Sequence, residues 1–268
     1  MADRAYKAFI VEGEVREPLI IDNISSIFFQ HENYKIITLP AGENIYMLWK
    51  KLKEDDFDTD IIEVLRERSQ EVREQLADLQ RDDFAEVYLF FDYDVHHTNL
   101  GKQEETDVIA EMLESFDNET ENGKLYISYP MVEALRDFQP GECGQETACF
   151  ISMEEIKDYK RISTERAYNP NFKEYDIELW KEIVNVFAMR VSCLLDLPRT
   201  LEYEQYRDVV TPSKIYALES GENQEQRVFV LSAFPEFLAD YFGMQLWKSW
   251  VKHAQNRLER QSCGKGMN

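Results

Sequence analysis

Short apolar runs alternate with amphipathic segments along the first half of the chain. Compact runs rich in β-branched and aromatic residues predict buried strands, whereas apolar residues at three- and four-residue spacing predict helices. We expect strands at 6–12, 34–39, 87–91 and 124–128. We expect helices at 18–28, 45–52 and 108–116, and one long amphipathic helix over 61–79.

This order of elements predicts the fold class. Strands that alternate with helices are typical of an α/β protein with a mainly parallel sheet flanked by helices on both faces. Such a sheet buries its strands on both sides, in agreement with the nearly continuous apolar run Val-Tyr-Leu-Phe-Phe at 87–91.

The pattern changes near residue 140, where a Pro-Gly pair at 140–141 predicts a turn or linker. We therefore expect two regions: a catalytic domain at 1–140 and a mainly helical accessory region at 141–268. Apolar residues between Ile177 and Val191, and from Pro235 past Trp250, predict helices there. The segments 215–218 and 228–231 flank a turn-like stretch and predict a hairpin.

Composition narrows the class of protein. Hydrophobic residues make up 44% and aromatic residues 13% of the 268-residue chain, which excludes global disorder. No apolar stretch approaches the length of a membrane span, and the first residues do not resemble a signal peptide. The 4 cysteines lack zinc-site spacing and are interpreted as reduced thiols, so we expect a cytoplasmic protein without contact to a membrane.

The net charge of −22 bears on the partners of the chain. A strongly acidic surface repels the phosphate backbone, so this chain is not expected to grip DNA or RNA by itself. Cleavage of nucleic acid stays compatible with this charge if divalent cations or a basic partner supply positive charge.

Acidic residues follow two of the expected strands. Glu12 closes the first strand, and Asp92 and Asp94 close the strand at 87–91. Ligands of parallel α/β sheets lie beyond the carboxyl ends of the strands. Carboxylate oxygens at this position suit Mg²⁺ or Mn²⁺.

The Asp-x-Asp pair by itself is not specific to one chemistry. It also occurs in sugar transferases, and Asp92-Tyr93-Asp94-Val95 resembles the nucleophile motif of haloacid-dehalogenase-type phosphatases. In those phosphatases the motif commonly lies near the start of the fold, whereas several elements precede it here. Solvated acids at a strand end would produce the same pattern.

The combination of motifs resembles the Toprim domain, and most closely the RloB, AbiLii and AriB group of phage-defence proteins related to OLD-family nucleases. The resemblance covers 7–138 and rests on three ordered segments: Glu12-Gly13-Glu14 with Glu17-Pro18, then 91–96 (Phe-Asp-Tyr-Asp-Val-His), then 128–133 (Ser-Tyr-Pro-Met-Val-Glu). The aromatic residue that usually follows Glu133 in that group is replaced here by Ala134-Leu135.

The resemblance implies phosphodiester hydrolysis that depends on Mg²⁺ or Mn²⁺. Glu12, Asp92 and Asp94 would hold one or two ions, with Glu12 as a general base in the alternative. Glu133 is a fourth catalytic candidate, or else an acid at a helix N-terminus. The accessory candidates are Glu14, Glu17 and His96; for the two glutamates a solvated loop position is the simpler interpretation.

The leading functional hypothesis is an endonuclease that cuts DNA or RNA, tRNA included, as a toxic effector in antiphage defence. The resemblance implies an ABC-type ATPase partner that controls the nuclease, and a homodimer is compatible with cutting a duplex. The alternatives are a non-catalytic Toprim-fold partner or sensor subunit and a phosphatase with an aspartate nucleophile. We assign no substrate-binding residues from the sequence.

Overall fold

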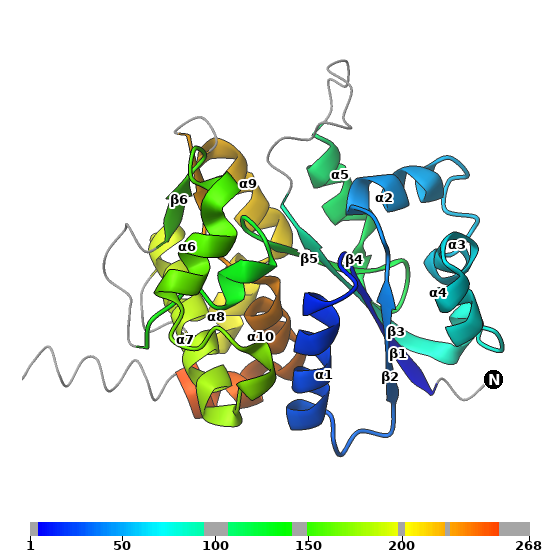
Figure 1. Cartoon of the computed structure of the whole chain (residues 1–268), viewed down its shortest axis with the longest axis horizontal. Helices are drawn as coiled ribbons and strands as arrows, with labels where there is room; N and C mark the ends of the chain where they lie inside the picture. Colours follow the sequence, from blue (N-terminus) through cyan, green and yellow to red (C-terminus); the bar gives the residue numbers. More distant parts are fainter. Residues whose placement is uncertain (1–4, 94–106, 141–148, 198–201, 223–225, 252–268) are drawn as a thin grey trace, which may run out of the picture. The chain divides into compact units, whose positions relative to one another are not determined.

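The computed structural model describes residues 5–93, 107–140, 149–197, 202–222 and 226–251 (Figure 1). The chain divides into two compact units, Met1–Ile127 and Ser128–Asn268. The division falls ahead of residue 140, where the sequence changes in character. Each unit is described by itself below.

A five-stranded sheet organises the first unit, in the order β2-β1-β3-β5-β4. Its strands are β1 (Tyr6–Val11), β2 (Lys35–Pro40), β3 (Phe84–Asp92), β4 (Asp117–Asn118) and β5 (Gly123–Ser128). β1 pairs in parallel with both β2 and β3, and the two-residue β4 is antiparallel to β5. The prediction of an α/β fold with a mainly parallel sheet is confirmed, and each of the four strands expected before residue 140 is present.

Helices cover both faces of this sheet. They are α1 (Arg16–Phe28), α2 (Ile45–Lys53), α3 (Ile61–Arg68), α4 (Gln70–Gln75) and α5 (Val108–Ser115), with a short 3-10 turn η1 at Arg81–Asp83. Figure 1 shows α1 on one side of the strands and α2 to α5 on the other. The chain moves from β1 to β2, then reverses across the sheet to β3 and β5. Because crossovers are right-handed, a reversal of direction places the next helices on the opposite face.

An aromatic row crosses the centre of the sheet. The rings of Phe9 and Phe90 stack with centroids 5.8 Å apart, and Phe90 stacks on Tyr126 at 5.7 Å. Residues Ala8 to Val11 of β1 are completely buried. Cross-strand aromatic pairs of this kind fix the neighbours of each strand and its register.

The prediction of one long helix over 61–79 is wrong. The structure breaks it at Ser69, whose backbone is extended and whose hydroxyl accepts a hydrogen bond from the Val72 amide at 3.4 Å. A serine side chain that bonds the backbone competes with helix continuation and favours a new N-terminus. The apolar periodicity continues through both helices, and for this reason it did not reveal the break.

The second unit is built mainly from helices. These are α6 (Tyr159–Arg166), α7 (Ile177–Leu194), α8 (Tyr203–Val209), α9 (Pro212–Glu222) and α10 (Ala233–Leu246). Short turns occur at η2 (Val132–Leu135), η4 (Ile156–Asp158) and η5 (Phe172–Glu174), and η7 (Trp247–Val251) extends α10 as a π-helix. None of the helices in the described part of the chain combines the length and apolarity needed to cross a membrane.

The prediction of a hairpin over 215–231 is also wrong. The first half of that segment belongs to α9, and β7 (Arg227–Phe229) pairs antiparallel with the distant β6 (Phe150–Ser152). Pro212 supplies a favourable first helical residue, and Ile215 and Glu219 share one buried helix face. The Glu219 carboxylate accepts the Phe229 amide at 2.8 Å and ties the helix to β7.

Candidate functional site

The strand order of the first unit defines where a ligand would bind. The chain leaves β1 toward β2 on one side, whereas β3 is followed by β5 on the other side. In open α/β sheets, ligands bind beyond the carboxyl ends of the strands at such a reversal. Val11 pairs with Phe90 in the β1–β3 register, so Glu12 and Asp92 follow closely on each strand. Both acidic residues therefore lie at the reversal point.

The structure brings Glu12 and Asp92 into direct contact. The Glu12 amide donates to the Phe90 carbonyl at 3.3 Å, which extends the ladder between the two strands by one residue. The Asp92 amide in turn donates to Oε2 of Glu12 at 3.2 Å. Both side chains are half-buried, so water can reach them. Two residues 80 positions apart in the sequence are thus held at one point.

The loop after β1 is held by Glu17, the second residue of α1. Its Oε1 accepts the Gly13 amide at 3.1 Å, and the side chain is buried, with 7% exposed. A Cβ on Gly13 would lie 2.6 Å from Oε2 of Glu17, so any other residue at this position would require the carboxylate to move. The interpretation of Glu17 as a solvated loop acid is wrong, because its carboxylate holds the turn that follows Glu12.

The other candidates are distributed differently. Glu14 is exposed to solvent, in agreement with a solvated loop position. Asp94 and His96 lie outside the described residues. Glu133 is fully buried in the first turn of η2 and belongs to the second unit, so it is not assigned to the Glu12–Asp92 site.

The donor set fits a hard divalent cation in its chemistry. Glu12 and Asp92 are half-buried residues with carboxylate side chains and are joined by one hydrogen bond, and Mg²⁺ commonly takes one or two protein carboxylates and retains several waters. Within 5–93 and the later described ranges, no group of three or more histidine, cysteine, aspartate or glutamate side chains is arranged to hold a metal. Asp94, the third expected ligand, falls outside those ranges.

Three buried cations in the described part of the chain were not predicted from the sequence. Lys7 of β1 is 2% exposed, Arg190 of α7 is 4% exposed and Arg136 is 7% exposed. The sequence offers one signal of such burial. It is a lysine beside aromatic and aliphatic residues in a short strand, or an arginine within an apolar helix face. That signal does not distinguish a buried charge from a side chain that reaches the surface.

Burial also changes the proton affinity of tyrosines in the second unit. Desolvation, and then the charge of the nearby Asp137 carboxylate, raise the pKa of Tyr159 well above its ordinary value. Desolvation likewise raises the pKa of Tyr206, with a further contribution from Glu236. Both hydroxyls therefore keep their protons and act as core groups rather than as nucleophiles.

The chain matches no family model, no curated protein and no solved structure.

Proposed function

We propose that this chain is a metal-dependent nuclease whose centre is formed by Glu12 and Asp92, with Asp94 as the third ligand. The observation that carries the proposal is the hydrogen bond between the Asp92 amide and the Glu12 carboxylate at the point where the strand order reverses. The ordered motifs that resemble Toprim nucleases agree with this placement.

The local contacts suit Glu12 for cation binding. An amide donor stabilises the ionised form of a carboxylate, which is the form that ligates metal ions. The bond also restricts rotation of the side chain, and the loop behind it is fixed by the contact between Gly13 and Glu17. Preorganised ligands of this kind hold an ion without reorganisation during the reaction.

Mg²⁺ or Mn²⁺ bound at this centre would polarise the scissile phosphate and lower the pKa of a bound water. Glu12 would orient the ion, or accept a proton from the attacking water in the alternative. Asp92 would contribute a second carboxylate from the neighbouring strand.

The charge of the chain supports a partner for the substrate interaction. A protein with 52 acidic and 30 basic residues repels a polyanion at long range. We propose that an ABC-type ATPase with a basic surface docks the chain and controls its toxicity in antiphage defence, as the resemblance implies. Release as a homodimer would place two centres on one duplex or folded RNA.

A cleavage assay tests the proposed activity. The full chain, with and without a candidate ABC-type ATPase partner, is incubated with plasmid DNA, single-stranded DNA, tRNA and ribosomal RNA in Mg²⁺, Mn²⁺ or EDTA. We expect metal-dependent cleavage of at least one substrate and a loss of about 100-fold or more in Glu12→Gln and in Asp92→Asn, because each removes a charged ligand. Glu71→Gln, an exposed glutamate of α4, is the matched control and should retain activity.

The same variants separate the alternatives. A phosphatase with an aspartate nucleophile would hydrolyse a phosphomonoester, require the Asp-x-Asp pair and tolerate Glu12→Gln. A non-catalytic subunit would cleave nothing in any arm, with or without the ATPase. Either result would overturn the nuclease proposal.

A further inference from the structure

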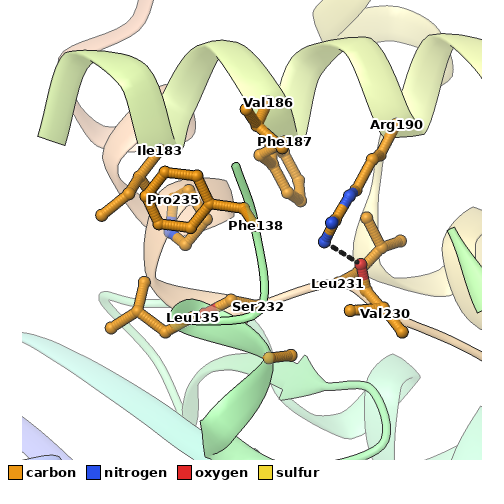
Figure 2. A pocket seen from close by; sticks show the side chains of 11 residues that line it. Leu135, Phe138, Ile183, Val186, Phe187, Arg190, Val230, Leu231, Ser232 and Pro235 are labelled. Atoms are coloured by element: carbon orange, nitrogen blue, oxygen red, sulfur yellow. Dashed lines mark hydrogen bonds between the residues drawn. The ribbon is translucent and has the colours of Figure 1, made fainter. Parts of the chain in front are cut away.

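A buried arginine lies in the interior of the second unit. Arg190 belongs to α7, where Ile183, Val186 and Phe187 form the neighbouring apolar face. Only 4% of its surface is exposed. Figure 2 shows its side chain reaching from the helix toward the carbonyl of Val230.

The guanidinium makes two hydrogen bonds, and both acceptors are neutral. Nη1 donates to the Val230 carbonyl at 3.0 Å and Nη2 to the Asp137 carbonyl at 2.7 Å. Nε has no hydrogen-bond acceptor among the described residues. Within the same part of the chain, no carboxylate forms an ion pair with this guanidinium, and the Asp137 carboxylate faces Arg166 at 3.6 Å instead.

A buried charge in this state is costly. Carbonyl dipoles satisfy N–H groups, but they supply no net negative charge, and an ion removed from water without a counter-ion costs several kcal/mol. Lys7 in the first unit shows the usual solution, because it is equally buried and contacts two carboxylates. A negative charge from outside the chain would balance the charge of Arg190.

Arg190 also lines a small cavity. The cavity has a volume of ≈ 20 Å³, and its other walls include Phe138, Phe187, Leu231, Ser232 and Pro235 (Figure 2). A space of this size holds about one water-sized particle. The lining side chains are mainly apolar, and Arg190 is the one charged side chain among them.

We infer that the cavity beside Arg190 binds one small monovalent anion of the size of chloride. A halide fits the available space, supplies the missing negative charge and can accept a hydrogen bond from Nε. The site is independent of the Glu12–Asp92 centre and of the proposed nuclease activity.

Thermal unfolding of the full chain tests this inference in solution. Sodium chloride is exchanged for sodium gluconate at constant ionic strength, since gluconate is too large to enter. We expect chloride and bromide to raise the Tm of the wild type by about 2–4 °C, with saturation. A shift that follows total salt, or the same shift in gluconate, would overturn the inference.

Two variants localise the effect. Arg190→Met removes the charge and retains much of the volume, so the halide dependence should disappear. Arg161→Met changes an exposed arginine of α6 that pairs with Glu165, and it should keep the wild-type dependence. Equal halide dependence in Arg190→Met and the wild type would place the anion elsewhere.

A crystallographic measurement keeps the inference testable if Arg190→Met does not fold. Crystals of the wild-type chain are soaked in sodium bromide, and anomalous differences at the bromine edge are collected. We expect a peak within hydrogen-bond distance of Nε of Arg190. A cavity that contains only water under these conditions would refute the site.

Discussion

The two ends of the β1–β3 pair carry charged residues of opposite character. At the amino end, Lys7 contacts Glu32 at 2.8 Å and Glu86 at 3.1 Å, and its ammonium lies 4.7 Å from the centre of the Tyr34 ring. At the carboxyl end, Glu12 and Asp92 place two acids together. The same two strands thus hold a mixed-charge cluster at one end and an acidic pair at the other.

The difference separates a structural role from a binding role. Lys7 is almost completely buried and its carboxylate partners are about a quarter exposed, so the cluster locks β1 to β3 and to the segment after α1. Glu12 and Asp92 are more open to water, and acidic side chains at the carboxyl end of parallel strands are suited to binding a cation. Stability should therefore depend on the amino end, and metal binding on the carboxyl end.

The largest effect on stability is expected at Lys7. Lys7→Met leaves two partly hydrated carboxylates beside a buried apolar chain, and we expect a loss of about 3 kcal/mol, at the lower end for breaking a buried ion pair. Chemical denaturation measures this loss. Lys35→Met, on an exposed lysine of β2, is the control and should change stability by less than about 0.5 kcal/mol.

A nearly unchanged free energy of unfolding in Lys7→Met would contradict the structural role of the amino end. A loss equal to that of Lys35→Met would mean that the contacts of Lys7 with Glu32 and Glu86 contribute little. Metal binding at Glu12 should be unaffected in Lys7→Met, because the two sites lie at opposite ends of the strands.

An intermediate effect is expected at the turn between β1 and α1. In Gly13→Ala the new methyl group collides with the buried Glu17 carboxylate, and the side chain must move and give up the Gly13 amide. We expect a loss of about 1–2 kcal/mol in unfolding experiments.

A double-mutant cycle checks the cause of that loss. Glu17→Ala removes the colliding carboxylate, so Gly13→Ala should cost less in the Glu17→Ala background than in the wild type. Additive losses would mean that the two residues act independently, and that the turn is not held by their contact.

The smallest effect on stability is expected at Glu12 itself. In the absence of divalent ions, Glu12→Gln keeps an acceptor for the Asp92 amide and should change stability by less than about 1 kcal/mol. The difference should appear on addition of Mn²⁺, which we expect to raise the Tm of the wild type but not that of Glu12→Gln. An equal Mn²⁺ response in both proteins would place the ion away from this pair.

Local patterns predicted most of the first unit. They failed where the same spacing of apolar residues is compatible with two different structures. The strands at 6–12 and 87–91 were predicted correctly because short runs of β-branched and aromatic residues favour a buried strand. The break at Ser69 was missed because the apolar positions stay in phase on both sides of it. The hairpin was wrong because the apolar pattern at 215–218 suits a strand and a helix equally, and long-range contacts, such as the pairing of β7 with β6, decide between them.

The candidate site shows the same division. The sequence by itself indicated that acids close two strands, because the alternation of strands and helices places strand ends at one edge of a parallel sheet. It did not determine that these strands are neighbours, that the Asp92 amide meets the Glu12 carboxylate, or that Glu17 is buried under Gly13. Nor did it reveal the buried charges of Lys7 and Arg190.

Spacing along the chain determines which way a side chain faces within its own element. The strand order, the register and the burial of charged groups depend on contacts between residues far apart in the sequence, and only the tertiary structure decides these.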